Sequence, residues 1–161
     1  MPEPTIALRS ATQRDLAWLQ RLAAEDSVAM MLAVDAVDRL PGALARGELV
    51  VSVAAGEPVG AAQLAVRNRR SRIVELQPVM LEPTRRGRGL GVATVRAVGT
   101  EVLQRRGMHR LEAEVYGFNH DALRTFARAG FVREGVRRQA YERHGARHDG
   151  VLFGLLVTDL Y

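Results

Sequence analysis

The sequence contains neither cysteine nor lysine. Without cysteine it has no disulfide framework, no thiolate metal site and no cysteine nucleophile, so an acyl-enzyme linked through cysteine is excluded. All 23 basic residues are arginine, which excludes lysine Schiff bases and a lysine phosphate anchor. The histidines show no spacing typical of metal ligands, and we predict no metal site. They are His109, His120, His144 and His148.

Long hydrophobic runs, low-complexity tracts and internal repeats are also lacking. The most apolar early run, Val28–Val34, is too short to span a bilayer and is followed by Asp35 and Asp38. The first residues, Met1-Pro2-Glu3-Pro4, do not have the pattern of a secretory signal. With 161 residues, 47% of them hydrophobic, the chain is expected to form one domain over 1–161. We expect a cytoplasmic protein with no membrane partner.

Aromatic residues are scarce, at 5%, although the net charge is +5. Nucleic-acid binding normally combines basic surface with aromatic stacking, and here 18 acidic residues are interspersed among the basic ones. A nucleic-acid partner is therefore not expected. The densest basic cluster, formed by Arg67, Arg69, Arg70 and Arg72, is interpreted as a solvated hairpin tip.

Hydrophobic periodicity predicts alternating strands and helices in a mixed α/β, more narrowly α+β, fold. The predicted strands are Thr5–Arg9, Leu49–Ala54, Val59–Arg67, Arg72–Leu81, Leu111–Tyr116, Phe131–Arg143 and Asp149–Val157. The predicted helices are Gln13–Ala24, one within Ala36–Arg46 interrupted near Pro41, one reaching about Arg106, and one opened by Asn119 as N-cap. Short connections between the strands predict a mixed, mostly antiparallel sheet flanked by helices.

A basic, glycine-rich loop from Arg85 to Thr94 joins a predicted strand to a predicted helix. Glycines allow successive backbone N–H groups to converge on an anion, and the helix directs its positive dipole end at the same point. A triphosphate loop would require lysine and then serine or threonine after Gly91, where Val92 and Ala93 stand instead. A dinucleotide fingerprint also fails, because counting from Gly87 its last position is Val92. A phosphorylated cofactor of another kind is indicated.

The pattern Arg/Gln-x-x-Gly-x-Gly/Ala is filled by Arg86, Gly89 and Gly91. At this point the chain resembles the GCN5-related N-acetyltransferase (GNAT) family. Two further segments agree: Glu75 lies eleven residues before Arg86, and the segment from Asn119 to Ala129-Gly130-Phe131 is similar to the family's Asn…Gly-Phe segment. The last third, including His148–Phe153, is similar to the ribosomal-protein N-terminal acetyltransferase branch.

The resemblance implies a GNAT fold and acetyl-CoA (coenzyme A) as cofactor. The pyrophosphate would be held by Arg86, Gly87, Arg88, Gly89, Leu90 and Gly91. Backbone groups of Val79, Met80 and Leu81, together with Asn119 and Phe126, would contact the cofactor arm. Asn119 is also interpretable as a plain N-cap, and Phe126 as core packing. Pro78 would mark a bulge where the strand splays from Leu111–Tyr116; the alternative is an ordinary edge strand.

Acetyl transfer to an amine requires removal of a proton, and the resemblance makes Glu75 the catalytic base. Regular alternation would put Glu75, Gln77, Val79 and Leu81 on one face. The alternative for Glu75 is a partly exposed strand glutamate that pairs with a neighbouring arginine such as Arg72. Glu112 and Glu114 are further candidates for the base; the alternative is that both are solvated residues on the face of the sheet.

The acid that protonates the departing thiolate is a second open role. Family members commonly place a tyrosine for this role seven residues after the asparagine, where this chain has Phe126. Tyr116 and Tyr141 could take the role instead; the alternative is that each is a strand aromatic that contributes to packing.

We therefore expect an N-acetyltransferase that acts by direct attack in a ternary complex. Its acceptor is a small-molecule or peptide amine: a protein N-terminus, an amino acid or an amine-bearing antibiotic. An acidic segment favours a cationic amine, unless it is only solvated surface; it contains Glu25, Asp26, Asp35 and Asp38. The alternatives are a non-catalytic acyl-CoA sensor and an acyltransferase that uses another donor, such as aminoacyl-tRNA. For the oligomeric state, a homodimer is one of the options.

Overall fold

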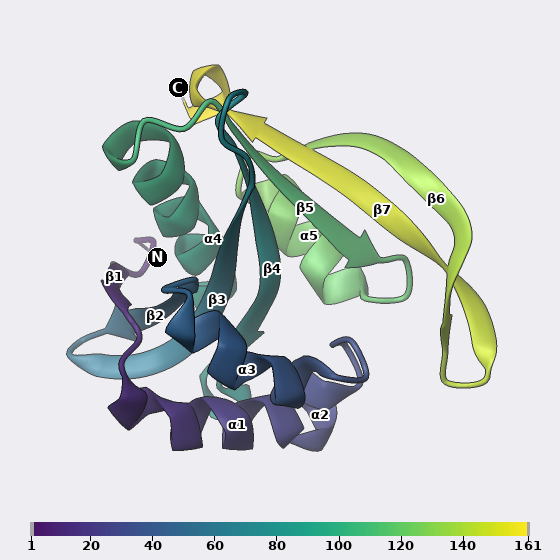
Figure 1. Ribbon diagram of the computed structural model, residues 1–161, viewed down its shortest axis with the longest axis horizontal. Coiled ribbons are helices and arrows are strands. Elements are labelled where there is room, and N and C mark those ends of the chain that lie inside the picture. Colours follow the sequence, from purple (N-terminus) through teal and green to yellow (C-terminus); the bar gives the residue numbers. More distant parts are fainter. Residues whose placement is uncertain (1, 161) are drawn as a thin grey trace.

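A computed structural model describes residues 2–160 and contains one seven-stranded sheet in this range, in the order β1-β2-β3-β4-β5-β7-β6 (Figure 1). The strands are β1 (Ala7–Ser10), β2 (Leu49–Ala54), β3 (Glu57–Asn68), β4 (Ile73–Leu81), β5 (Arg110–Tyr116), β6 (Val132–Arg143) and β7 (Ala146–Leu156). Neighbouring strands pair antiparallel except β4 and β5, which are parallel. The predicted mixed, mostly antiparallel sheet is confirmed.

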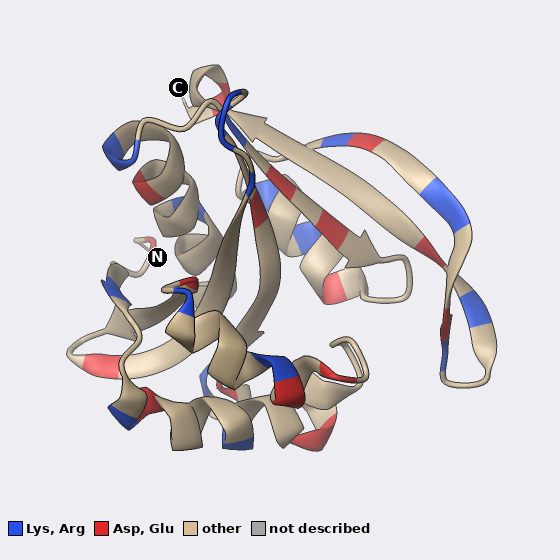
Figure 2. Ribbon diagram, in the orientation of Figure 1, with Lys and Arg blue, Asp and Glu red and all other residues tan. Residues whose placement is uncertain are grey.

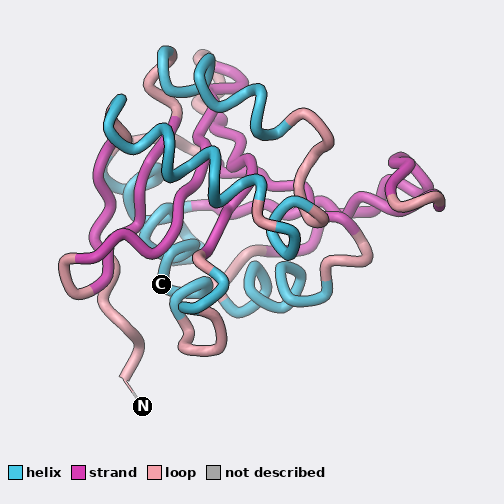
Figure 3. The backbone as a smooth tube through the Cα atoms, turned by 90° about the horizontal axis from the view of Figure 1, so that it is seen from below, coloured by secondary structure: helices cyan, strands magenta, loops and turns pink. Residues whose placement is uncertain are grey.

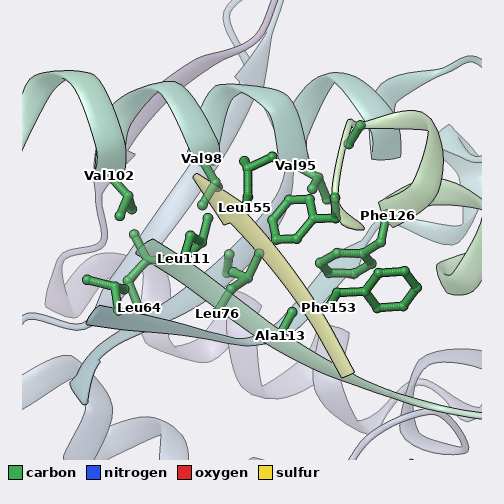
Figure 4. Packing of buried hydrophobic residues seen from close by; sticks show 14 of the residues in the cluster. Leu64, Leu76, Val95, Val98, Val102, Leu111, Ala113, Phe126, Phe153 and Leu155 are labelled. Atoms are coloured by element: carbon green, nitrogen blue, oxygen red, sulfur yellow. The ribbon is translucent and has the colours of Figure 1, made fainter. Parts of the chain in front are cut away.

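Helices cover both faces of this sheet (Figure 3). They are α1 (Leu16–Ala24), α2 (Asp26–Ala29), α3 (Ala36–Ala45), α4 (Leu90–Thr100) and α5 (His120–Arg128). On one face, side chains of α4 and α5 such as Val95, Val98 and Phe126 pack with sheet residues (Figure 4). On the other, Leu19 and Leu40 of α1 and α3 pack in a second cluster. We call these the α4–α5 face and the α1–α3 face.

The alternation of β5 determines which side chains reach which face. Leu111, Ala113 and Val115 are buried in the cluster on the α4–α5 face. Because successive strand residues point to opposite sides, Glu112, Glu114 and Tyr116 project from the α1–α3 face, where they stay partly exposed. Strand β5 therefore combines a buried apolar side with a polar side, as its sequence pattern predicts.

A β-bulge at Pro78 changes this alternation in β4. Ala62 of β3 pairs with Val79 and Gln63 pairs with Gln77, so Pro78 is an extra residue without a partner. Leu76 belongs to the cluster on the α4–α5 face and Val79 packs against it, whereas Met80 belongs to the α1–α3 cluster. The prediction that Val79 shares a face with Glu75 and Gln77 is wrong, because the bulge shifts the phase by one residue. The edge-strand alternative is also wrong, since β4 has neighbours on both sides.

Two further predictions about elements require correction, and one short helix was not predicted. Helix α3 continues through Pro41, where an interruption was expected, because the proline removes one N–H donor while Leu40 and Ala43 stay anchored in the core. The short helix α2 was missed; the side chain of Glu25 accepts a hydrogen bond from Ser27 N at its start, 3.1 Å away. Strand β7 begins at Ala146 rather than Asp149 and forms a long hairpin with β6.

Between residues 2 and 160, none of the helices is long and apolar enough to cross a membrane. The same range contains no group of three histidine or acidic side chains arranged to hold a metal ion.

Candidate functional site

The sheet opens into a slot between β4 and β5. These strands pair only from Ile73 to Leu76 on β4, opposite Arg110 to Ala113 on β5, although both continue well beyond. After Leu76 the edge of β4 that faces β5 therefore has no strand partner, and Val79–Leu81 pair only with β3. The predicted bulge and splay are confirmed.

A cavity of about 750 Å³ lies at this slot. Its lining includes Val95 and Phe126 from the α4–α5 face together with Leu32 and Leu40 from the α1–α3 face. Because residues of both faces contribute, the cavity passes through the sheet at the slot. Of the predicted site residues, these line it: Glu75, Val79, Met80, Leu81, Arg86, Gly87, Gly89, Leu90, Gly91, Asn119 and Phe126. Arg88 is exposed and is not among the lining residues.

The glycine-rich loop forms one end of the cavity. Gly89 is the N-cap of α4 with φ of 75°, a left-handed conformation that glycine adopts without strain. The first turn of a helix leaves N–H groups without intrahelical acceptors, and Leu90 and Gly91 of this turn line the cavity. The guanidinium of Arg86 lies nearby, where its Nη1 donates to Ser27 Oγ at 3.0 Å. This end is suited to an anion.

Two basic residues of this end were missed by the sequence analysis. Arg124 and Arg128 of α5 line the same cavity. The available signal was their spacing of four residues, which places them on one face of a short helix, Arg124 in its middle and Arg128 at its end. Arg124 also pairs with Asp121, so part of its charge is already balanced.

Asn119 and Phe126, two of the residues expected to contact the cofactor arm, also have structural roles. The side chain of Asn119 accepts a hydrogen bond from Ala122 N at 3.2 Å, so it is an N-cap as well as a lining residue. Phe126 is 6% exposed, and its ring contacts Phe131 and Phe153 with centroids 5.0 and 5.7 Å away. Phe126 therefore belongs to the core while one side of it borders the cavity.

Glu75 and Glu112 lie side by side where β4 and β5 still pair. Arg67 Nη1 is 3.9 Å from a carboxylate oxygen of Glu75 and 3.4 Å from one of Glu112. Glu75 does pair with an arginine, as the alternative interpretation predicted, but the partner is Arg67 and not Arg72, which instead donates to the carbonyl of Gly107 at 3.1 Å. Glu75 lines the cavity, whereas Glu112 does not.

Glu114 lies further along β5, also on the α1–α3 face and in the cavity wall. Its Oε2 accepts a hydrogen bond of 2.7 Å from Tyr141 Oη. Its Oε1 is buried and finds no hydrogen-bond donor within residues 2–160; the nearest guanidinium, at Arg137 Nε, is 3.7 Å away. Burial, and then the hydrogen bond to Glu114, raise the pKa of Tyr141 to about 12. Figure 2 shows acidic residues on β4 and β5, which border the slot.

An apolar wall faces these carboxylates from the segment between α1 and α3. We define it as Val28, Met31, Leu32, Ala33, Ala36 and Leu40, all of which line the cavity. The β6–β7 hairpin holds this wall: Arg143 donates to the carbonyls of Leu32 and Met30, and His144 Nε2 lies 2.9 Å from the Met30 carbonyl. The acidic residues of this region do not line the cavity, which favours their interpretation as solvated surface; they are Glu25, Asp26, Asp35 and Asp38.

Comparison with known proteins identifies the same architecture. The sequence profile described as the acetyltransferase (GNAT) family matches residues 16–131. A spermidine N-acetyltransferase from Vibrio cholerae, solved in complex with CoA and spermine, is 18% identical with a TM-score of 0.83, covering 97% of this chain and 98% of that one. AAC(6')-Ib, solved in complex with paromomycin and acetyl-CoA, is 20% identical with a TM-score of 0.78, covering 96% and 95%. At these identities the likeness concerns the fold.

Proposed function

This chain belongs to the acetyltransferase (GNAT) family, and from that membership we propose that it transfers the acetyl group of acetyl-CoA to a primary amine by direct attack in a ternary complex. The observation that carries this proposal is the single cavity at the slot, which joins the anion-suited loop at one end to Glu75 and Glu114 at the other. The donor and the acceptor can therefore meet within one continuous space.

The loop end fits the phosphate groups of the donor. Backbone N–H groups of Gly87–Gly91 and the dipole of α4 favour negative charge there, with the guanidinium of Arg86 beside them. The unpaired edge of β4 at Val79–Leu81 offers backbone groups to the amide-containing arm, because no strand satisfies them on that side. Arg88, which the resemblance included, would contribute its backbone only.

The reaction forms one N–C bond and breaks one C–S bond. An ammonium has no free electron pair, so the amine first gives up a proton, and we assign Glu75 as the base that accepts it directly or through water. The nitrogen gives up a second proton as the C–S bond breaks, and the thiolate that leaves takes up one, so the overall reaction from an ammonium releases one proton. Phe126 carries no hydroxyl, and the pKa of Tyr141, about 12, lies far above that of a thiol, about 8.5, so Tyr141 is a poor acid for this thiolate. Water supplies this proton.

The decisive variant is Glu75→Gln, which keeps the size of the side chain and removes its basicity. We expect kcat to fall by roughly 10²- to 10⁴-fold, with the acetyl-CoA Kd unchanged by calorimetry. Glu112→Gln is the matched control, because Glu112 shares the contact with Arg67 but does not line the cavity. Full activity of Glu75→Gln across pH would show that another group is the base.

The same measurements separate the alternatives. A non-catalytic sensor would bind acetyl-CoA without consuming it in the presence of any amine. An enzyme using another donor would show no calorimetric signal with acetyl-CoA, and competition between CoA and tRNA would then identify it. The ribosomal-protein branch, a cytoplasmic location and a homodimer stay predictions.

A further inference from the structure

Gln63 of β3 is a buried polar side chain with one hydrogen-bonding atom still free. It is 8% exposed and lies on the α1–α3 face, two residues from Ala61 of that cluster. Its Nε2 donates to Glu48 Oε2 at 2.7 Å. Its Oε1 has no donor within residues 2–160 and stays accessible to solvent. Because Gln63 is otherwise buried and lines the cavity, the space that its Oε1 reaches is the cavity.

Glu48 determines which atom of this amide is the free one. A carboxylate only accepts hydrogen bonds, so the nitrogen of Gln63 is the end turned to Glu48 and the oxygen is the other end. Arg46 donates to both carboxylate oxygens of Glu48, at 2.9 and 3.2 Å. This contact lowers the pKa of the Glu48 carboxyl and keeps it ionised at neutral pH. Arg46 and Glu48 therefore hold the amide of Gln63 in one orientation.

A second carboxamide lies beside the first. Gln77 of β4 is the register partner of Gln63, and it projects from the same face because Leu76 before it belongs to the cluster on the α4–α5 face. The side chain of Gln77 is half-buried, lines the cavity and has no hydrogen-bond partner within residues 2–160. Its amide can turn to donate or to accept. We call Gln63 and Gln77 the amide floor of the cavity.

The amide floor lies next to the proposed base. Glu75 precedes Gln77 by two residues on the same face, about 7 Å along the strand, so one small molecule can reach both. The apolar wall lines the same cavity. Arg39 of α3 also lines it but is already paired with Asp35 at 2.8 Å. A charged group placed on the amide floor would have no counter-ion there, whereas a neutral polar group would be satisfied.

We propose that the acceptor of the acetyl transfer carries a neutral hydrogen-bonding group, a hydroxyl or an amide, close to its amine, and an apolar body. The O–H or N–H of this group donates to Gln63 Oε1, Gln77 supplies a second hydrogen bond, and the body packs on the apolar wall. Amino alcohols and amino acid amides have this chemistry. The inference rests on the proposed acetyl transfer and makes Gln63 and Gln77 specificity-determining residues, with Glu48 as a positioning residue for Gln63.

The test compares kcat/KM, by release of the CoA thiol, for four amines with one apolar body: isoamylamine, leucinol, leucinamide and leucine. We expect the better of leucinol and leucinamide to exceed isoamylamine by about tenfold or more, because isoamylamine leaves the amide floor unpaired. These two acceptors distinguish a hydroxyl from an amide. Leucine should be poorer than leucinamide, since its carboxylate would lie on the amide floor without a counter-ion.

The other results are equally informative. Equal values for isoamylamine and the two neutral polar amines would overturn the inference while leaving acetyl transfer intact. A preference for leucine would also overturn it, and would point to Arg39 as the partner of a carboxylate. Turnover of none of the four, with acetyl-CoA bound in calorimetry, would overturn both the inference and the proposed acetyl transfer.

Variants of the amide floor then locate the contact. Gln63→Leu and Gln77→Leu keep the size of the side chain and remove its hydrogen-bonding groups. Each should lower the preference for the better polar acceptor over isoamylamine by roughly three- to tenfold, whereas a structural defect would lower both values and leave their ratio unchanged. Gln20→Leu on α1, which does not line the cavity, is the matched control. An unchanged ratio in both variants would overturn the inference, and Gln77→Leu keeps the test valid even if Gln63→Leu does not fold.

The orienting contact has its own test. Glu48→Ala leaves the amide of Gln63 free to rotate. We expect it to raise KM for the better polar acceptor several-fold, and to leave kcat and the KM for isoamylamine unchanged. An equal rise of KM for both acceptors would overturn the assignment of Glu48 as a positioning residue.

Discussion

Two glycines of the loop, Gly89 and Gly91, are required for different reasons. Gly89 has a positive φ, so its replacement would strain the backbone whatever the surrounding space. Gly91, by contrast, has ordinary helical geometry, and a Cβ there would lie 3.7 Å from Thr125 Cγ2, a normal contact. The folded chain alone does not require glycine at 91. The remaining reason for a glycine is the approach of a ligand to the helix N-terminus.

Gly91→Ala should therefore separate ligand binding from folding. We expect the melting temperature to stay the same or to rise slightly, because alanine in a helix is favoured over glycine by roughly 0.5–1 kcal/mol. The acetyl-CoA Kd should weaken by about tenfold, since the methyl group holds phosphate away from the backbone donors. Calorimetry and thermal melting measure the two effects. An unchanged Kd would mean that the phosphates lie elsewhere along the loop.

Among the elements, the β6–β7 hairpin has a role that its own sequence does not reveal. Its tip reaches the backbone carbonyls that follow α2, through Arg143 and His144. Arg143 also lies over the ring of Tyr116, 5.7 Å from its centroid, which ties the hairpin to β5. The apolar wall is therefore positioned by an element more than a hundred residues away in the chain.

Arg143→Ala should loosen this wall. We expect the acceptor KM to rise several-fold and the free energy of unfolding to fall by about 1 kcal/mol, because partly buried carbonyls lose a charged donor. The acetyl-CoA Kd should not change, since the loop end is formed by other elements. Arg147→Ala, from the same hairpin, removes an exposed pair with Glu142 and is the matched control. Steady-state kinetics and thermal melting would check both; a changed acetyl-CoA Kd would contradict the assignment.

In the molecule as a whole, two apolar clusters share one sheet. Ala61 and Met80 contribute to the cluster under α1–α3, while Ala62 and Leu76, on the same strands, contribute to the cluster under α4–α5. If these strands unfolded, the side chains of both clusters would become exposed to solvent. This arrangement supports the expectation of a single domain.

Thermal unfolding should consequently be one cooperative transition. Trp18, the only tryptophan, packs against the α1–α3 cluster, and its Nε1 donates to Glu82 at 2.6 Å. Its fluorescence reports on that face, whereas far-UV circular dichroism reports on the whole sheet and all helices. We expect the two midpoints to coincide, as two-state behaviour requires. Midpoints several degrees apart would show that the α1–α3 layer unfolds by itself.

Much of this architecture was predictable because its signals are local. Alternation in Leu111–Tyr116, the glycine pattern after Arg86 and the N-cap at Asn119 each depend on residues a few positions apart. They predicted the strands, the loop-to-helix junction and one end of the cavity. Pro78 signalled an irregular strand as well. It did not reveal which face of the sheet Val79 and the residues after it would occupy, since a bulge is defined only by the pairing with the partner strand.

The sequence by itself determined the alternating elements, the anion-suited loop and the position of Glu75 on the strand before it, because backbone preferences and side-chain periodicity act within a few residues. The tertiary structure decided which residues meet at the cavity wall and behind it: Glu114 and Tyr141 lie over Gly150, and Arg143 holds the backbone of the segment that carries the apolar wall. Those contacts join residues 27 to over 110 positions apart. They depend on strand order, register and the bulge in β4, which only the packing of the whole chain establishes.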